Sequence, residues 1–216
     1  MSDLQPWVFM GGTFDPVHNG HLRTALEIQQ WLACDQVHLI PSRSPVHRDE
    51  PGCTARQRYE MLALAVENES FLSVDAREIE SQEASYTLNT LRSLRQELGE
   101  HRPLVMVMGV DAYLTLPTWR QWDTFLSLCH IIVVSRPGYH FHPEGQINEL
   151  TRKHRMDKPE ALSLRPCGGV LIHELTPLGI SATQIRALIA QGQSPRYLMP
   201  DRVWQYIQQN KLYGYK

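Results

Sequence analysis

The sequence predicts an α/β protein built on a doubly wound parallel sheet. Its 216 residues suit one sizeable hydrophobic core, and short apolar runs alternate with helical patterns along the chain. Runs that are apolar throughout indicate strands buried on both faces, which is typical of parallel sheets covered by helices. The alternation therefore predicts a Rossmann-like fold with helices on both faces of the sheet, in a single domain that spans residues 1–216.

Six apolar runs are the expected strands. They lie at residues 7–11, 37–40, 71–74, 104–108, 131–134 and 170–172. In a doubly wound sheet, ligands bind beyond the carboxyl ends of the strands, at the point where the strand order reverses. The first and fourth strands usually flank that point, so residues 11–21 and 109–111 are expected to hold the functional site.

Apolar residues at helical spacing predict helices between these strands. One helix is expected through residues 22–32, and a second through residues 61–66 begins at a capping box made by Thr54 and Gln57. A third helix is expected over residues 85–99. These helices supply the crossovers that a parallel sheet needs.

Two polar stretches interrupt the alternation, near residues 42–52 and 136–169. Each is expected to be a loop or a short helical insertion within the domain. The second carries a basic cluster that runs from Arg152 to Arg155. A solvated helix face is the favoured interpretation of that cluster, ahead of a binding site.

Composition excludes several classes of function. The chain has 21 Lys and Arg against 23 Asp and Glu, and the basic residues are scattered, so we expect neither nucleic acid nor a membrane surface as a partner. No apolar run approaches the roughly 18 residues of a membrane span, and the first residues lack a signal-peptide pattern. The four cysteines form no C-x-x-C pair, which argues against zinc knuckles and disulfides and for a cytoplasmic protein.

The segment GGTFDPVHNGH follows the first predicted strand. Its glycines let a ligand approach the backbone closely, and His18 and His21 stand three residues apart at a helix start, where their side chains can face the same way. Helix N-termini attract anions through N–H groups and the helix dipole. One histidine alone would as readily be structural, but the pair in this segment favours polyphosphate binding. Neither G-x-G-x-x-G nor a Walker loop is present.

A second helix start lies near the end of the chain, in the segment ISATQIR. Ser181 and Gln184 have the spacing of a capping box, which places Arg186 one turn inside the helix. A guanidinium can bind phosphate oxygens with its planar fork. An arginine outside such a motif would be interpreted as an ordinary surface residue, so the prediction of phosphate binding by Arg186 depends on the surrounding motif.

Asp111 follows the fourth predicted strand and a glycine, Gly109. At the carboxyl end of a strand, a carboxylate can accept hydrogen bonds from the hydroxyl groups of a ribose. The alternative is that Asp111 caps a helix, as aspartate often does.

The histidine segment and the ISATQIR segment together resemble the two signature motifs of the nucleotidyltransferase superfamily, and within it those of the bacterial nicotinate-nucleotide adenylyltransferases. The resemblance covers nearly the whole chain, because further motifs of that family appear in the family order. They lie at residues 41–48, 85–87, 109–111, 118–119 and 136–138. The histidine motif alone indicates only the superfamily, and the resemblance to the subfamily depends on these intermediate motifs.

The resemblance implies an enzyme that transfers an adenylyl group from ATP to nicotinate mononucleotide, giving nicotinate adenine dinucleotide and pyrophosphate in NAD biosynthesis. It implies that His18, His21 and Arg186 act in catalysis. The residues that it places on the ATP side are Gly11, Gly12, Thr13, Phe14, His18, His21, Gly109, Asp111, Ile180, Ser181, Thr183 and Arg186. Mg²⁺ is expected to come with ATP and to bridge its phosphates, so no metal ligand from the protein is expected.

On the acceptor side, the resemblance implies that Tyr86, Thr87, Trp119, His47 and Arg48 bind nicotinate mononucleotide. The helix predicted to start at the first two would favour a nicotinate carboxylate over a neutral amide, through its N–H groups and its dipole. Trp119 would stack on the pyridine ring. A core aromatic is an equally good interpretation of that tryptophan.

Three alternatives stay open from the sequence. A relative would adenylate nicotinamide mononucleotide or phosphopantetheine, or would transfer a cytidylyl group. A metallohydrolase would hold a metal with His18, His21 and His47, although no carboxylate partner is evident and the pair His140 and His142 lies in the polar insertion. A nucleotide sensor would bind ATP without releasing pyrophosphate.

Overall fold

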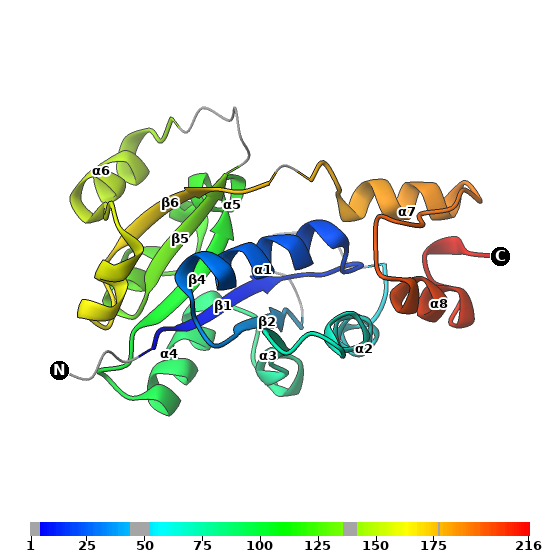
Figure 1. Cartoon of the computed structure of the whole chain (residues 1–216), viewed down its shortest axis with the longest axis horizontal. Coiled ribbons are helices and arrows are strands. Elements are labelled where there is room, and N and C mark those ends of the chain that lie inside the picture. The colour runs from blue at the N-terminus through cyan, green and yellow to red at the C-terminus, as the bar shows by residue number, and fades with distance from the viewer. Residues whose placement is uncertain (1–4, 44–51, 136–141, 177) are drawn as a thin grey trace.

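A computed structural model describes residues 5–43, 52–135, 142–176 and 178–216 and shows a six-stranded sheet with helices on both faces (Figure 1). The strands are β1 (Trp7–Gly12), β2 (Val37–Pro41), β3 (Leu72–Val74), β4 (Leu104–Gly109), β5 (His130–Ser135) and β6 (Val170–Glu174). All six predicted strands are confirmed, with small differences at their ends. Most of the first polar insertion lies outside the described residues.

The strands follow the order β3-β2-β1-β4-β5-β6, and every neighbouring pair is parallel. The chain runs outward from β1 to β3, crosses back to place β4 beside β1, and then runs outward to β6. This is the doubly wound order of Rossmann-like folds. The predicted fold class is confirmed, and the strand order reverses between β1 and β4.

Helices of very different length connect the strands. The α-helices of the described residues are α1 (Asn19–Leu32), α2 (Ala55–Val66), α3 (Arg77–Glu80), α4 (Thr87–Leu98), α5 (Val110–Leu114), α6 (Gly145–His154), α7 (Ala182–Ala190) and α8 (Asp201–Gln209). Four short 3₁₀ helices accompany them: η1 (Leu116–Thr118), η2 (Trp122–Ser127), η3 (Pro159–Leu164) and η4 (Leu212–Gly214). In these ranges no helix combines the length and the apolar character needed to cross a membrane.

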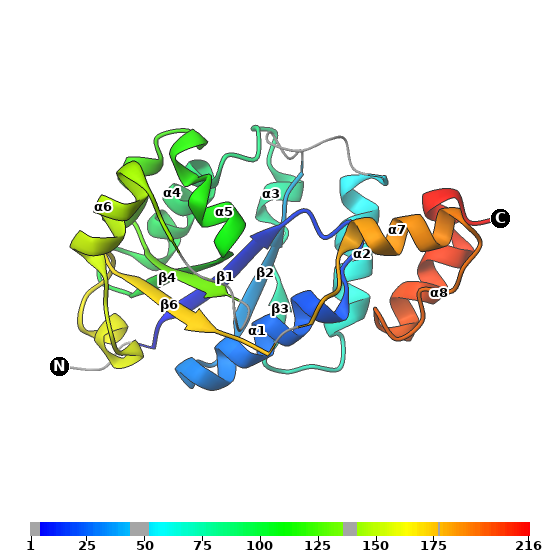
Figure 2. The ribbon, with the colours of Figure 1, turned by 90° about the horizontal axis from the view of Figure 1, so that it is seen from above.

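Alternation along each strand fills two separate cores. Val8 and Met10 of β1 pack with α1, α2, α7 and α8 on one face of the sheet, whereas Trp7 and Phe9 pack with α4, α5 and α6 on the other. Figure 2 shows α1 on one side of the sheet and α4 and α5 on the other. Because successive side chains of a strand point to opposite faces, a continuous apolar run supplies both cores.

Two predicted helix boundaries are present as expected. Thr54 Oγ1 accepts a hydrogen bond from the Gln57 backbone N–H at 3.2 Å, and Gln57 Oε1 accepts one from the Thr54 N–H at 3.0 Å, so the capping box of α2 is complete. Gly99 ends α4 with a φ of 76°, a conformation that favours glycine.

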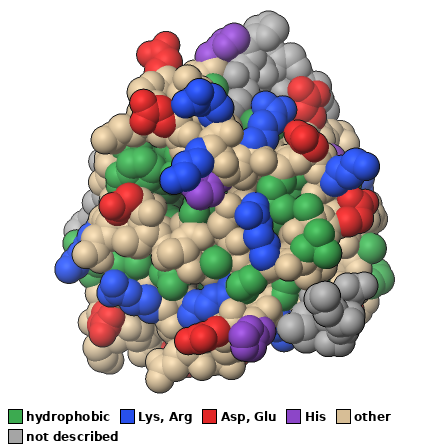
Figure 3. All heavy atoms as spheres, turned by 90° about the vertical axis from the view of Figure 1, so that its left-hand side faces the viewer, with side chains coloured by type: hydrophobic (Ala, Val, Ile, Leu, Met, Phe, Trp, Pro, Cys, Tyr) green, Lys and Arg blue, Asp and Glu red, His purple; other side chains and the backbone are tan. Residues whose placement is uncertain are grey.

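Part of the second polar insertion folds into α6 and η3. Arg152 and Lys153 are exposed in the last turn of α6, where positive charge complements the helix dipole. Figure 3 views this end of the molecule, and basic and acidic side chains are interspersed on it. The basic cluster therefore lies on a solvated helix end, in agreement with the favoured interpretation.

Candidate active site

The carboxyl ends of β1 and β4 lie side by side at the reversal of strand order, as expected. Gly11 and Gly109 are both exposed at the ends of these strands, and a Cβ added at either would meet no atom within 4 Å. Helices α7 and α8 lie beyond this end of the sheet (Figures 1 and 2). A nucleotide can therefore approach the backbone of both strands at the point where the strand order reverses.

His18 and His21 are brought together as predicted. His18 is the N-cap residue of α1 and is 5% exposed. The two rings stack with centroids 3.6 Å apart and an interplanar angle of 24°. Phe14 also contacts the His21 ring, edge-on with centroids 5.0 Å apart. The histidines thus have fixed orientations at the start of α1, which costs a ligand little ordering entropy.

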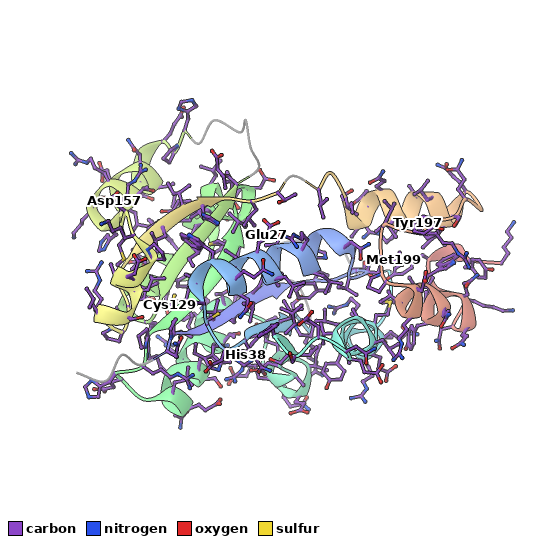
Figure 4. All side chains as sticks on the ribbon, in the orientation of Figure 1. Glu27, His38, Cys129, Asp157, Tyr197 and Met199 are labelled. Atoms are coloured by element: carbon purple, nitrogen blue, oxygen red, sulfur yellow. The ribbon has the colours of Figure 1, made fainter. Side chains whose placement is uncertain are left out.

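The start of α1 differs in one respect from the sequence expectation. The Asn19 N–H donates to the Leu198 carbonyl at 2.9 Å, and the Asn19 side chain donates to the Tyr197 carbonyl at 2.9 Å. The His21 N–H donates to the His18 carbonyl at 2.9 Å. Backbone donors that were expected to bind phosphate are therefore partly used by the protein itself. The segment before α8 that supplies these acceptors is labelled at Tyr197 and Met199 in Figure 4.

The two signature segments meet in space. Arg186 Nη1 donates to the Asp15 carbonyl at 2.6 Å and lies 3.5 Å from Asp15 Oδ2. A Cβ added at Gly20 would lie 3.6 Å from the Ile180 carbonyl oxygen, which is an ordinary contact distance, and 3.0 Å from the His18 ring, so the two segments pack against each other here. The tertiary structure thereby joins segments that lie at opposite ends of the sequence.

The start of α7 confirms part of the predicted cap. Ser181 is the N-cap residue, and its Oγ accepts a hydrogen bond from the Gln184 N–H at 3.2 Å. Thr183 Oγ1 lies 3.4 Å from Arg186 Nη2. The chain before α7 is held along α1 by Glu27 (Figure 4), whose Oε2 accepts from the Thr176 N–H at 2.9 Å.

Asp111 does not cap its helix. Gly109 occupies the N-cap position of α5, and Asp111 follows in the first turn with its side chain exposed. The capping alternative for Asp111 is therefore wrong, and its carboxylate faces solvent beside the carboxyl end of β4.

The described residues that were expected on the acceptor side lie at the start of α4 and the end of η1. Tyr86 is the N-cap residue of α4 and Thr87 its first residue, which confirms the predicted helix start. Trp119 is half-buried and contacts Phe125 edge-on with centroids 6.4 Å apart, so it belongs to the edge of the core. The Arg120 guanidinium carbon lies 4.9 Å from the centroid of the Tyr86 ring. His47 and Arg48 lie outside the described residues.

A cavity of about 230 Å³ lies beside the start of α4 and includes Glu78 and Ser85 in its lining. Thr90 Oγ1 donates to Glu78 Oε1 at 2.5 Å, and Ser85 Oγ accepts from the Arg43 N–H at 2.9 Å. Burial raises the pKa of Glu78, against the opposing effect of hydrogen bonds from Thr90 and Ser85. The hydrogen bond from Arg43 to Ser85 therefore joins the segment after β2 to the start of α4 beside this cavity.

Arg58 is a structural residue of the site that the sequence analysis missed. It is fully buried, and its guanidinium donates to the Thr13 carbonyl at 2.7 Å and to the Arg43 carbonyl at 2.9 Å. Burial lowers the pKa of this arginine. Its spacing to Met61 and Leu62 places it on the buried face of α2, and that periodicity was the available signal.

Side chains that could ligate a metal do not cluster in the described ranges. No group of three or more His, Cys, Asp or Glu side chains there could hold a metal ion. Asp15, which lies closest in sequence to the histidine pair among the acidic residues, is committed to donors from the protein itself. His142 is exposed, and His140 and His47 are not among the described residues.

Comparisons with known proteins agree with this geometry. Residues 9–188 match the cytidylyltransferase-like family. Probable nicotinate-nucleotide adenylyltransferases of Hahella chejuensis and Marinobacter nauticus are 46% and 47% identical to this chain and cover 99% and 96% of it, with 98% and 96% of their own lengths aligned. A Plasmodium falciparum nicotinic acid mononucleotide adenylyltransferase complexed with NaAD is 16% identical and matches with a TM-score of 0.73, covering 98% of both chains. The last likeness shows the shared fold.

These matches extend over most of the chain and, for the relatives, over nearly all of their own length. The chain belongs to the cytidylyltransferase-like family of nucleotidyltransferases. The subfamily predicted from the motifs is confirmed as well, because the relatives that match along their length are named as probable nicotinate-nucleotide adenylyltransferases.

Proposed function

We propose that the protein catalyses adenylyl transfer from ATP to nicotinate mononucleotide, with nicotinate adenine dinucleotide and pyrophosphate as products. The observation that carries the proposal is the meeting of the two signature segments at the reversal of strand order. The stacked pair His18 and His21 and the guanidinium of Arg186 lie there beside Asp15 and the open backbone of the strand ends. The names of the relatives supply the acceptor.

The attacking group in this reaction is the phosphate monoester of nicotinate mononucleotide. Its second pKa is near 6, so it is mostly ionised at neutral pH and needs no general base. One of its oxygens forms a bond to the α-phosphorus of ATP, and the bond from that phosphorus to the oxygen of the β-phosphate breaks as pyrophosphate leaves. Catalysis then consists of aligning two anions and stabilising the charge on the phosphates.

On the ATP side, His18 and His21 donate hydrogen bonds to the phosphates, and Arg186 binds the departing pyrophosphate. Their fixed orientations support direct transition-state stabilisation, because preorganised donors need no rearrangement during the reaction. The exposed carboxylate of Asp111 accepts hydrogen bonds from the ribose hydroxyls. The open space over Gly109 admits the nucleotide to this position.

On the acceptor side, the start of α4 at Tyr86 and Thr87 binds the nicotinate carboxylate. Helix N-termini favour a carboxylate over a neutral amide, and the Arg120 cation over the Tyr86 ring acts in the same direction. Trp119 borders the pyridine ring from its half-buried position. His47 and Arg48 are proposed to approach the substrate phosphates from the loop that follows β2.

Mg²⁺ would accompany ATP. The described residues fit an ion held chiefly through the ATP phosphates and water, since the Asp15 carboxylate is bonded to protein donors and the described part of the chain has no cluster of metal ligands. Such an ion supplies partial neutralisation of the phosphate charge. The side chains of the protein do the remaining work of binding and orienting the two substrates.

Pyrophosphate release, measured with each combination of substrates, tests the proposed function. We expect release with ATP and nicotinate mononucleotide, and much less with nicotinamide mononucleotide, with phosphopantetheine, or when CTP replaces ATP. A preference for another acceptor would overturn the proposed substrate. ATP binding without pyrophosphate release for any acceptor would indicate a nucleotide sensor. Stoichiometric zinc in protein purified without a histidine tag would instead support the metallohydrolase alternative.

A further inference from the structure

Asp15 connects segments that are far apart in the sequence. Its Oδ1 accepts a hydrogen bond from the Tyr213 hydroxyl at 2.7 Å and one from the Cys53 thiol at 3.3 Å. Its Oδ2 accepts from the Gly52 N–H at 2.8 Å. The Asp15 side chain is 7% exposed, so these donors replace nearly all of the water that would otherwise hydrate its carboxylate. The end of the chain is thereby bonded to the loop that carries the histidine pair.

The arrangement leaves Arg186 only one oxygen of that carboxylate. An arginine and a carboxylate form their strongest pair with two parallel N–H···O bonds, one to each oxygen. Here Oδ1 of Asp15 accepts from both Tyr213 and the weaker donor Cys53, and Arg186 reaches Oδ2 at 3.5 Å, which is longer than a normal charge-assisted hydrogen bond. The Arg186 side chain stays 36% exposed. Asp15 therefore orients the guanidinium mainly through its backbone carbonyl, which accepts from Arg186 Nη1 at 2.6 Å, while its carboxylate forms no two-bond pair with Arg186.

We propose that Tyr213 is a positioning residue for Arg186. Its hydroxyl occupies Oδ1 of Asp15 and so prevents a closed, two-bond pair between Asp15 and Arg186 that would withdraw the guanidinium from the phosphates of ATP. This inference rests on the proposed function, in which Arg186 is a phosphate ligand.

The backbone around Tyr213 is shaped to bring this hydroxyl to Asp15. Lys211 has a φ of 49° and Tyr213 a φ of 58°, both in the left-handed region that residues with a side chain rarely adopt. A Cβ added at Gly52 would lie 2.8 Å from the Tyr213 ring, so the ring packs directly on the backbone there. The C-terminal turn thus adopts a backbone conformation that is unfavourable for residues with a side chain, and this conformation places the Tyr213 ring against Gly52. A side chain at position 52 would collide with the ring.

The hydroxyl keeps its proton at neutral pH. Burial, followed by the nearby Cys53 and Asp15, raises the pKa of Tyr213. Burial likewise raises the pKa of the Cys53 thiol to about 12. Both groups therefore remain neutral donors to Asp15, whose Oδ1 stays occupied over the physiological pH range.

The test compares two hydroxyl deletions in the C-terminal part of the chain, Tyr213→Phe and Tyr206→Phe. Tyr206 is the matched control, because its hydroxyl donates to Glu60 Oε2 at 2.5 Å on α2 and not to Asp15. Calorimetry with ATP and no acceptor measures the nucleotide Kd. We expect Tyr213→Phe to weaken ATP binding by about tenfold, the effect of one charge-assisted hydrogen bond, and Tyr206→Phe to leave it unchanged.

A double-mutant cycle separates positioning from a general structural effect. In an Arg186→Ala background, Tyr213→Phe should cause no further loss of ATP affinity, because the guanidinium that it positions is gone. Gly52→Ala, which displaces the ring and keeps the hydroxyl, should reproduce the loss if Tyr213→Phe folds poorly. In the full reaction, the KM for ATP should rise while the acceptor KM stays constant.

Two results would overturn the inference: an equal loss of ATP affinity from Tyr213→Phe with and without Arg186, or an equal loss from Tyr206→Phe. The ATP titrations contain no acceptor. A wrong acceptor would therefore contradict the proposed function and leave this test of Tyr213 intact.

Discussion

Two pairs of histidines occupy opposite ends of the same sheet. His18 and His21 follow β1 at the carboxyl ends of the strands and stack on each other at 3.6 Å. His38 and His130 lie in the first residues of β2 and β5, at the amino ends; His38 and Cys129, the residue before His130, are labelled in Figure 4.

The second pair is bonded into the fold. His130 Nδ1 accepts from the Gly169 N–H at 2.9 Å, so the ring carries its proton on Nε2, which lies 2.9 Å from the Arg165 carbonyl. His38 stacks on Trp7 with centroids 4.1 Å apart. Burial lowers the pKa of both His38 and His130 to about 4, which keeps them neutral. We therefore expect the histidines at the carboxyl ends of the strands to bind ligand, whereas those at the amino ends are structural.

The strongest test of this difference removes a ring at the carboxyl end. His21→Ala should lower kcat by about 10²–10³-fold, the typical effect of losing one preorganised donor, and should leave the melting temperature close to that of the native protein. Pyrophosphate release and thermal unfolding measure the two quantities. His101→Ala, which alters an exposed histidine, is the control. Near-normal turnover of folded His21→Ala protein would remove this residue from the mechanism.

The complementary change is made at the amino end. His130→Ala leaves the Gly169 N–H and the Arg165 carbonyl without their partner in a fully buried place. We expect a loss of about 2–4 kcal/mol in the free energy of unfolding, with kcat unchanged at temperatures where the variant is folded. Denaturant titration measures the loss. A variant with native stability and reduced turnover would contradict the structural role.

Substitutions of Arg186 test the second signature motif in the same way. Arg186→Ala should reduce kcat/KM for ATP by about 10–100-fold, the effect of a hydrogen bond to a charged group. Arg186→Lys should recover only part of the loss, because an ammonium cannot form the two-bond fork. Steady-state kinetics with varied ATP measures both variants. Full recovery by lysine would show that charge alone suffices.

The pH dependence of the free energy of unfolding tests the structural role of His130 at the amino end of the sheet. The pKa of His130 is lowered to about 4 in the folded protein from an ordinary value of 6.5, so the unfolded chain binds the proton more readily. This stabilisation is present above pH 6.5 and is lost as the pH falls toward 4. Between pH 6.5 and 5 we expect the native protein to lose about 1–2 kcal/mol more than His130→Gln. Parallel pH curves would contradict the neutral, buried state.

The smallest expected effect lies on the acceptor side of the carboxyl end. Arg120 is exposed, so its attraction for a carboxylate is weakened by solvent. Arg120→Gln should raise the KM for nicotinate mononucleotide by about 2–5-fold, without raising the KM for nicotinamide mononucleotide. Kinetics with both acceptors measure the difference. An equal change for both would show that Arg120 does not sense the carboxylate.

Local patterns in the sequence determined the elements and part of the site. The six strands could be located because burial on both faces requires continuous apolar runs, and the start of α2 because the capping box of Thr54 and Gln57 is a contact between near neighbours. The histidine pair and Arg186 could be selected because their motifs combine helix starts with cationic side chains. All of these signals act over a few residues.

Only the tertiary structure decided how those pieces meet. Nothing local in the sequence relates Tyr213 to Asp15, or the buried Arg58 to the carbonyl of Thr13, because these hydrogen bonds depend on how distant segments pack. The same holds for the start of α1, where the Leu198 carbonyl takes a backbone donor that the motif alone predicts to be available for phosphate. A motif specifies which groups are present. Long-range packing determines which of those groups remain free to bind a ligand, because each buried polar group must find a partner wherever the fold places one.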